Sequence, residues 1–304
     1  MRVLVTGATG FVGGNLLPAL LERGHDVLAF VRDRDRYDGP DGVELIEGDL
    51  LDPPIELPDI DAAFYLVHSM GSGGDFAARD RLAARTFVDA ADAAGIERVI
   101  YLGGLGDDDD QLSDHLRSRR EVEHLLETGT FDLTTLRAAI VVGDGSAGFE
   151  LITQLADRLP VMVTPKWIET ECQPIFVDDL VAYLAGVLET PETAGRTFEI
   201  GGPEVLTYRE MLERTAKALS GRPPYIVPTP IISPRISALW LRLFTDVSLD
   251  VARPLIAGLR NTVVVGESGI DALVDGGVLR GAVHLREHVV ERVVGHRPPL
   301  SGDG

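Results

Sequence analysis

A glycine-rich turn near the start of the chain is the feature that most constrains its fold. Residues 3–5 are apolar, and residues 6–13, Thr-Gly-Ala-Thr-Gly-Phe-Val-Gly, lead directly from them into a helical pattern. Gly7 lets the chain turn sharply after a strand, Gly10 lets the backbone approach a pyrophosphate, and Gly13 lets the helix pack close to the strand. Glycine suits any tight turn, but this order of strand, turn and helix predicts a dinucleotide-binding unit. The phosphates would bind N–H groups at the helix start, with contacts from Gly7, Thr9, Gly10, Phe11, Val12 and Gly13.

Strand and helix patterns alternate through the first half of the chain. The predicted strands are residues 1–6, 26–31, 43–47, 62–67, 98–102 and 131–136, and the predicted helices are residues 11–23, 75–94 and 113–127. A polar loop is expected at residues 103–111. This alternation favours βαβ units with right-handed crossovers. We therefore expect an α/β fold with a doubly wound parallel sheet of six strands, the Rossmann arrangement.

The pattern becomes less regular after Val142, where prolines are frequent. We expect residues 1–142 to form the dinucleotide-binding domain. Residues 143–304 should form a smaller α/β lobe for substrate or partner, interleaved with the first domain and lying over the carboxyl edge of the sheet, where ligands bind. The clearest helices of the lobe are residues 178–188 and 207–219, the second starting with a capping-box spacing of Thr207 and Glu210.

Residues 236–244, which include Trp240, are strongly apolar, with Arg242 as their only charge. Such a segment suits a buried helix of the lobe. A helix that lies on a membrane surface or faces a partner is the alternative.

The chain is strongly acidic, with a formal net charge of -20 at pH 7. Lys166 and Lys217 are its only lysines, so arginine supplies the other basic side chains. This charge repels nucleic acid, and we expect no nucleic-acid partner. Acid excess with so little lysine resembles proteins of salt-loving organisms, in which ionic strength screens self-repulsion; an ordinary acidic protein is the alternative. The halophilic interpretation predicts that the melting temperature rises between low and molar potassium chloride, and a fall would contradict it.

The numbers and positions of cysteine and histidine argue against disulfide-bonded and metal-binding proteins. Cys172 is the only cysteine, which excludes an internal disulfide, and the seven histidines lack the spacing of metal ligands, so we expect no metal. The chain opens on a strand pattern and contains no apolar run long enough to span a bilayer. We expect a cytoplasmic protein, monomeric or homodimeric, with association with a membrane surface or a larger complex left open.

The residue after the second predicted strand indicates which dinucleotide is preferred. A carboxylate there binds the adenosine ribose of NAD, whereas a cation binds the 2′-phosphate of NADP. This chain has Arg32 at that position, with Arg34 close by. We therefore expect NADP, held by Arg32 as a bidentate, charge-assisted donor. NAD is the alternative, because Asp33 is adjacent.

Further cofactor contacts are expected after the third and fourth strands. Asp49 can accept from the adenine amino group while Leu50 packs on the ring, and the backbone near Val67 and His68 is expected to line a ribose. The glycine turn, residues 48–50 (Gly-Asp-Leu) and residues 65–70 (Tyr-Leu-Val-His-Ser-Met) together resemble the short-chain dehydrogenase/reductase superfamily. Residues 196–203 and 207–210 are similar to its extended and atypical branches. These include sugar-nucleotide epimerases, NmrA-like redox sensors and an accessory subunit of respiratory complex I.

The resemblance implies a tyrosine acid/base with a lysine four residues later, but this chain contains no such pair. The usual serine or threonine after the fifth strand is replaced by glycine, so Gly103 is expected to line the cofactor. His115 and Arg119 occupy the positions equivalent to the pair, and their four-residue spacing puts both on one helix face. Both are catalytic candidates: His115 as a general acid near neutral pH, Arg119 as a donor to ribose hydroxyls. A solvated helix residue is the alternative for His115.

Arg137 follows the sixth strand, where the resemblance implies a cofactor contact near the nicotinamide. An ion pair with Glu123 or Asp132 is the alternative. Three residues of the second half are expected to face the substrate cleft: Trp167, Cys172 and Gln173. Core packing is the alternative for Trp167.

Three functions are compatible with these residues. The first is an NADPH-dependent oxidoreductase of the atypical branch, acting on a small carbonyl or quinone-like molecule. The second is a non-catalytic NAD(P)-binding redox sensor or accessory subunit, favoured by the missing tyrosine and lysine. The third is a nucleoside-diphosphate-sugar epimerase, which ranks last because epimerases of the superfamily normally retain that pair.

Overall fold

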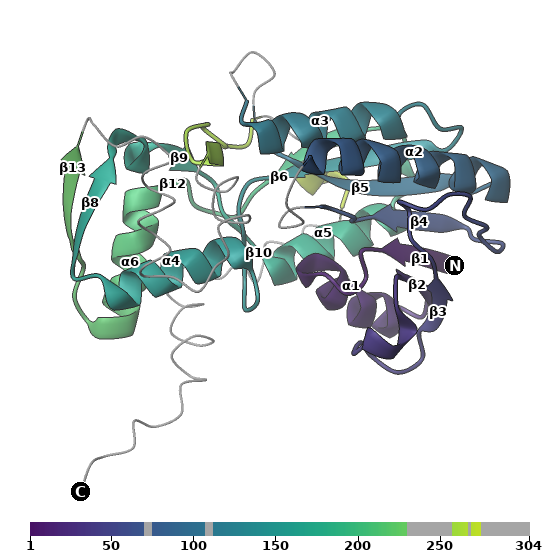
Figure 1. Cartoon of the computed structure of the whole chain (residues 1–304), viewed down its shortest axis with the longest axis horizontal. Helices are drawn as coiled ribbons and strands as arrows, with labels where there is room; N and C mark the ends of the chain where they lie inside the picture. The colour runs from purple at the N-terminus through teal and green to yellow at the C-terminus, as the bar shows by residue number, and fades with distance from the viewer. Residues whose placement is uncertain (70–74, 107–111, 230–256, 267–268, 275–304) are drawn as a thin grey trace, which may run out of the picture.

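The computed structural model describes residues 1–69, 75–106, 112–229, 257–266 and 269–274. At its centre is a seven-stranded sheet in which all neighbouring strands are parallel. In order across the sheet, the strands are β11 (Thr197–Ile200), β6 (Asp132–Ala138), β5 (Arg98–Gly104), β4 (Ala62–Tyr65), β1 (Arg2–Thr6), β2 (Asp26–Val31) and β3 (Glu44–Glu47). The predicted doubly wound parallel α/β fold is confirmed (Figure 1).

Helices cover both faces of the sheet (Figure 1). On one face α1 (Phe11–Glu22) packs against α5 (Val177–Glu189), and on the other α2 (Phe76–Ala94) packs against α3 (Asp114–Leu126). Because both faces are covered, the central strands read as continuous apolar runs, and residues 3–5 and 62–65 are all buried. Asp75 caps α2 by accepting from the Ala78 N–H at 3.0 Å, and Gly95 ends this helix in the left-handed conformation.

The sheet differs from the sequence prediction in one added strand and in several strand ends; β4 stops at Tyr65 rather than at residue 67, and β6 runs to Ala138 rather than to residue 136. Six strands were expected, whereas β11, from the second half of the chain, adds a seventh beside β6. β11 has only four residues, so its apolar pattern is too short to be predicted as a strand from the sequence. It forms because it can pair with the free edge of β6. The fifth strand also continues to Gly104, since residues 103 and 104 pair with β6. The expected polar loop therefore starts later, and its acidic residues 107–110 lie outside the described residues.

The second half of the chain builds a smaller unit beside the carboxyl ends of the strands (Figure 1). It contains α4 (Ala147–Arg158) packed on α6 (Tyr208–Ser220), and three strand pairs: β7 (Val141–Val142) with β10 (Ile175–Phe176), β9 (Glu171–Cys172) with β12 (Leu206–Thr207), and β8 (Val161–Pro165) with β13 (Tyr225–Thr229). The predicted capping box of α6 is confirmed: Glu210 N–H donates to Thr207 Oγ1 at 3.1 Å, and Thr207 N–H donates to Glu210 at 2.8 Å. Residues 236–244, the apolar segment, lie outside the described residues. Within the described ranges, no helix is long and apolar enough to cross a membrane.

The winding of the sheet reverses between β1 and β4. Successive strands run outward in one direction from β1 to β3, and in the other from β4 to β6. At such a switch point the connections leave β1 and β4 toward opposite faces, which opens a crevice at the carboxyl ends of the strands.

Candidate functional site

The glycine-rich turn joins β1 to α1 at this switch point. Gly7 has a φ of 71°, in the left-handed region that favours glycine. A Cβ atom on Gly13 would overlap the Gly7 carbonyl oxygen and lie 2.9 Å from the Ala8 Cα, so α1 approaches the turn as closely as glycine permits. The helix starts after Gly10, whose N-cap position supplies no side-chain hydrogen bond to the first N–H groups. The turn is thus a backbone cradle that fits the phosphates of a dinucleotide.

A pocket of about 740 Å³ opens from this cradle along the carboxyl ends of the strands. Its volume lies in the range of cofactor and ligand pockets. The walls include all the residues predicted for cofactor or catalysis except Arg137, namely Gly7, Thr9, Gly10, Phe11, Val12, Gly13, Arg32, Asp49, Leu50, Val67, His68, Gly103, His115 and Arg119. The structure therefore brings residues from five strand ends and two helices together at one site.

Arg32 is exposed at the end of β2 and lines the pocket. Its two neighbours are engaged elsewhere. Asp33 accepts from the Asp35 N–H at 3.0 Å, and Arg34 donates to the Leu45 carbonyl at 2.6 Å. Within the described residues Arg32 makes no hydrogen bond or ion pair, so its guanidinium can meet an anion such as a 2′-phosphate.

Asp49 and Leu50 follow β3 at the same end of the pocket. Asp49 Oδ1 accepts from the Leu51 N–H at 2.9 Å, which orients the carboxylate and lets its other oxygen meet an amino group. Leu50 is buried and offers an apolar surface beside it. This geometry suits an adenine ring.

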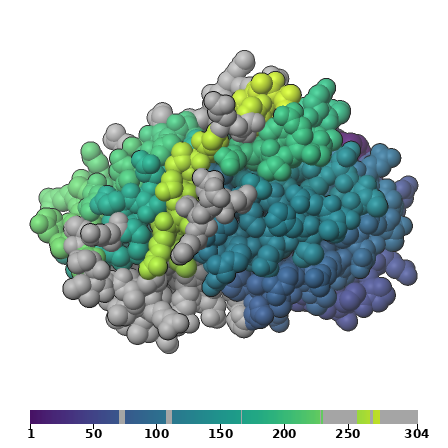
Figure 2. Space-filling view, turned by 90° about the horizontal axis from the view of Figure 1, so that it is seen from above, coloured from purple at the N-terminus to yellow at the C-terminus, as the bar shows by residue number. Residues whose placement is uncertain are grey.

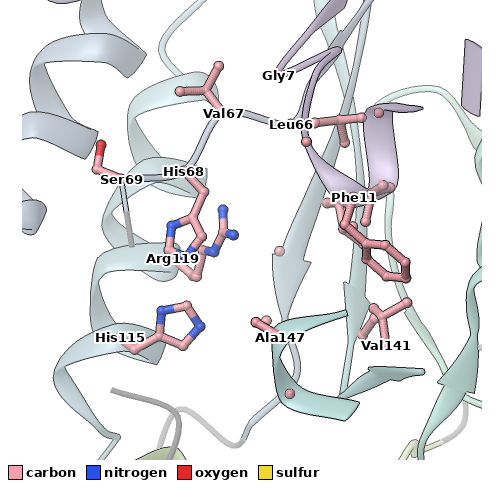
Figure 3. A pocket seen from close by; sticks show the side chains of 18 of the residues that line it. Gly7, Phe11, Leu66, Val67, His68, Ser69, His115, Arg119, Val141 and Ala147 are labelled. Atoms are coloured by element: carbon pink, nitrogen blue, oxygen red, sulfur yellow. The ribbon is translucent and has the colours of Figure 1, made fainter. Parts of the chain in front are cut away.

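Two imidazoles and a guanidinium lie on another wall of the pocket (Figure 3). His68 follows β4, while His115 and Arg119 are one turn apart on α3. The centroids of the two imidazole rings are 5.1 Å apart, with their planes inclined by 48°. Phe11 and Val141 lie across the pocket from them (Figure 3).

Burial, followed by the positive charge of Arg119, lowers the pKa of both imidazoles. The pKa of His68 falls to about 4, and that of His115 lies well below its ordinary value of 6.5. Both rings are therefore neutral at pH 7. This environment disfavours the predicted role of His115 as a protonated acid near neutral pH, although a neutral ring still offers one donor and one acceptor.

Among the described residues around the pocket, we find no tyrosine placed to act as an acid and no group of side chains that could bind a metal ion. Tyr65 and Tyr101 are fully buried in the core between the sheet and α2. Tyr208 lines the pocket, but burial raises the pKa of its hydroxyl, which hydrogen-bonds with the Cys172 thiol. In the described parts of the chain, no group of three or more His, Cys, Asp or Glu residues could hold a metal ion.

Arg137 lies outside the pocket lining. It donates to Glu123 Oε1 at 2.7 Å, and Arg120 donates to Glu123 Oε2 at 3.2 Å. Arg137 therefore forms the ion pair with Glu123 that was the alternative, and it does not make the expected contact with the cofactor. Side chains alternate between the two faces of a strand, and Arg137 points to the face covered by α3.

The expected cleft residues of the second half are also placed elsewhere, because none of them lines the pocket. Cys172 is fully buried, and burial raises the pKa of its thiol to about 12. Gln173 joins two loops, donating to the Gly202 carbonyl at 2.8 Å and accepting from the Val265 N–H at 3.0 Å. Trp167 packs against the apolar core of the second unit.

The pocket also contains residues that the sequence analysis did not single out. Ile140 follows β6, where the rule that ligands bind at the carboxyl ends of strands could have found it. Arg79, Tyr208, Leu259 and Val263 come from helices and a late segment that carry no sequence signal for this position. Figure 2 shows residues 257–266, in yellow, lying between the two parts of the molecule.

The fold and the pocket together define a Rossmann-type protein with a site for a dinucleotide. Residues 7–162 match the NAD(P)H-binding family, and the chain belongs to this family. The expected resemblance to the atypical and extended branches of the short-chain dehydrogenase/reductase superfamily is confirmed by this family match, by the relatives and by the fold of the structural neighbours.

Two relatives and one solved structure illustrate these similarities. Divinyl chlorophyllide a 8-vinyl-reductase of Zea mays is 27% identical, over 88% of this chain and 69% of its own length. The mitochondrial NADH dehydrogenase (ubiquinone) 1 alpha subcomplex subunit 9 of Arabidopsis thaliana is 26% identical, over 75% of this chain and 60% of its own length. A nucleoside-diphosphate-sugar epimerase from Staphylococcus aureus shares the fold, with a TM-score of 0.70 and 16% identity over 95% of this chain and 100% of that one.

Proposed function

We propose that this protein is an NADPH-dependent oxidoreductase that acts on an apolar carbonyl or quinone-like molecule. One observation carries the proposal: a single pocket joins the glycine cradle and Arg32 to an apolar chamber, with His68, His115 and Arg119 on its wall. A pocket of this extent can hold a dinucleotide and a second molecule in contact with it. The similarity to a protein named as a reductase supports the same class of reaction.

The chamber beyond the imidazoles indicates the kind of substrate. The pocket lining includes the apolar side chains of Leu105, Leu116, Ile140, Val141, Leu259 and Val263, together with Ser146 and Tyr208. Burying apolar surface against such walls contributes about 25 cal/mol per Å². None of these six apolar side chains can hydrogen-bond to the hydroxyl groups of a sugar nucleotide, which favours an apolar substrate over that of an epimerase.

In the proposed reaction, different residues of the chain would bind different parts of the cofactor. NADPH supplies the hydride when it is bound. The N–H groups at the start of α1 would hold its diphosphate, Arg32 its 2′-phosphate and Asp49 its adenine amino group. Arg119 can donate to ribose hydroxyls, while its fixed charge makes it unsuited to moving a proton.

Arg32→Ala tests the cofactor assignment. The variant is expected to weaken NADPH binding by about 10- to 100-fold, the loss of one charge-assisted contact, while NADH binding stays nearly unchanged. The reason is that the 2′-phosphate is the group that distinguishes the two cofactors. Isothermal titration calorimetry with NADPH and NADH measures both affinities.

Arg36→Ala is the matched control for this experiment. Arg36 is an exposed arginine in the same loop but outside the pocket lining, so its loss should leave both affinities unchanged. An equal loss for NADPH and NADH in Arg32→Ala would contradict the assignment. Oxidation of NADPH with a panel of apolar ketones, aldehydes and quinones tests the reaction itself.

A non-catalytic role as a redox sensor or accessory subunit is the second candidate. The observation that favours it is the combination of neutral imidazoles with the missing tyrosine and lysine, together with the similarity to a protein named as a subunit of an NADH dehydrogenase. Tight NADPH binding without turnover of any acceptor, combined with recovery in a larger assembly from native extract, would support this role over the first.

A further inference from the structure

The two-stranded sheet of β8 and β13 exposes a group of apolar side chains. Of the seven large apolar residues that are exposed in the described parts of the chain, four lie on this sheet, and each is between 39% and 71% exposed. We call these four residues the outer face: Val161, Val163, Tyr225 and Val227. The register of the strands places Tyr225 beside Val161 and Val227 beside Val163, so the four side chains form one continuous surface. The two strands lie at the opposite end of the molecule from β1, β2 and β3 (Figure 1).

The other face of this sheet is covered. Side chains alternate between the two faces of a strand, and Met162 and Ile226, which lie between the outer-face residues in sequence, pack into the apolar core with α4 and α6. The two strands run parallel, and parallel strands are normally covered on both faces. An exposed apolar surface on such a sheet is typical of an interaction site.

The free edges of the sheet are poor sites for an added strand. The Tyr225 N–H donates to the Pro160 carbonyl at 2.8 Å, and the N–H groups along a strand point alternately to its two edges. Pro165 and Pro228 therefore fall on the two free edges, where each removes a donor that a third strand would need. We expect a partner to meet the outer face rather than to extend the sheet.

Basic residues gather at the ends of this sheet, although the chain as a whole has a net charge of -20. Two stretches surround the sheet: one runs from the last turn of α4 to the end of the 3₁₀ helix η2 (Lys166–Glu169), and the other runs from the last turn of α6 to the end of β13. Their charged residues are four basic ones, Arg158, Lys166, Lys217 and Arg222, and two acidic ones, Asp157 and Glu169, which gives a local balance of +2. Both lysines of the chain are among them. Lys217 and Arg222 are exposed, so this end of the molecule favours an anionic surface.

A second copy of this chain fits the outer face poorly. Its four residues expose roughly 400 Å², about half of what each partner of a stable dimer buries. A two-fold axis would also bring the same basic residues of both copies to one interface, where like charges repel. Apolar side chains with basic residues beside them match instead the boundary between the acyl chains and the headgroups of a bilayer.

We propose that the outer face docks on a membrane surface. Its four side chains enter the acyl boundary of the bilayer, and Lys217 and Arg222 meet anionic lipid headgroups. The tyrosine suits this boundary, because its ring is apolar while its hydroxyl stays in contact with water. The contact is separate from the cofactor pocket, since none of the outer-face residues lines that pocket.

Sedimentation of the full-length protein with vesicles tests this proposal. The wild type is expected to bind vesicles of phosphatidylglycerol and phosphatidylcholine, and to bind pure phosphatidylcholine about tenfold more weakly, because the basic residues then lose their attraction to the surface. Val163→Thr combined with Tyr225→Thr should weaken binding to both kinds of vesicle about tenfold, since apolar area is lost while β-branched side chains keep the strands. Leu82→Gln is the matched control, because Leu82 is 42% exposed on α2, and it should bind as the wild type does.

The basic residues are tested separately. Lys217→Gln combined with Arg222→Gln should remove the preference for phosphatidylglycerol and leave binding to pure phosphatidylcholine unchanged. The melting temperature of each variant, followed by circular dichroism, shows that it is folded. A wild type that binds neither kind of vesicle would overturn the proposal, as would equal binding by the wild type and the threonine variant. A wild-type dimer in light scattering that this variant converts to a monomer, without vesicle binding, would assign the outer face to a second copy instead.

A fluorescent label locates the contact even if the threonine variant fails to fold. Cys172 is the only cysteine of the chain and is fully buried, so acrylodan reacts with a cysteine introduced on the surface. In Val227→Cys the emission of the label should shift to shorter wavelength when phosphatidylglycerol vesicles are added, because the label leaves water for the acyl boundary. Leu82→Cys should show no shift. Any other pattern, such as a shift in both variants or in neither, would overturn the proposal.

Discussion

Gly13→Ala is expected to abolish tight dinucleotide binding and to destabilise the fold. The added Cβ would overlap the Gly7 carbonyl oxygen and come within 2.9 Å of the Ala8 Cα, so α1 would have to move away from the turn. Its first N–H groups would then no longer converge on the phosphates. Loss of two charge-assisted hydrogen bonds weakens NADPH binding by on the order of 100-fold. The overlap itself lowers the free energy of unfolding by about 1–3 kcal/mol. Calorimetric titration and urea denaturation measure the two effects.

Gly14→Ala is the matched control for this substitution. A Cβ on Gly14 would have its nearest contact at 3.9 Å, from the Ala8 carbonyl oxygen, which is ordinary van der Waals contact. Alanine also favours the helix by about 0.5–1 kcal/mol over glycine. Gly14→Ala should therefore bind NADPH normally and be slightly more stable. Similar losses in both variants would show that the close approach of helix and turn is not the cause.

Glu123→Ala is expected to lower the free energy of unfolding by about 3–5 kcal/mol at pH 8. Glu123 is 1% exposed and accepts from Arg137 at 2.7 Å and from Arg120 at 3.2 Å. Its removal takes away the buried carboxylate that both guanidinium groups contact, so this carboxylate no longer compensates the desolvation of their charge. Burial raises the pKa of Glu123 to about 7, so pH 8 keeps the carboxylate ionised in the comparison. Urea denaturation followed by circular dichroism gives the value.

Glu121→Ala tests whether burial is the reason. Glu121 lies on the same helix and accepts from Arg81 at 2.7 Å, but both side chains of this pair are more than a third exposed. Exposed ion pairs contribute about 1 kcal/mol or less, because water already solvates both charges. Comparable losses in Glu121→Ala and Glu123→Ala would contradict the role given to the buried network.

The parallel sheet could be predicted because its central strands are apolar along their whole length and alternate with capped helices. The seventh strand could not, since β11 has four residues and gains its place from the free edge of β6. The fifth strand was predicted too short for a related reason. Gly103 and Gly104 look like a turn in the sequence, but pairing with β6 holds them in the sheet.

The sequence selected residues that line the pocket where position along a strand determines the location of a residue. Arg32, Asp49 and His68 each follow a parallel strand, and all parallel strands of one sheet end at the same edge. Prediction failed where the direction of a side chain mattered. Arg137 also lies near the end of a strand, yet it points to the α3 face. His68 was expected to contribute backbone, whereas its ring lies beside that of His115.

The sequence by itself determined the parallel α/β fold, the glycine cradle and the cation at the end of β2. These depend on local properties: the missing side chain of glycine, the apolar run of a buried strand and the charge of one residue. Only the tertiary structure decided which neighbours of Arg32 are engaged in other contacts and whether the imidazole of His115 is protonated. Asp33 and Arg34 are engaged elsewhere, and the neutral state of His115 comes from burial and from Arg119. Solvation and charge at a point in space are set by segments that are far apart along the chain, and folding alone brings those segments together.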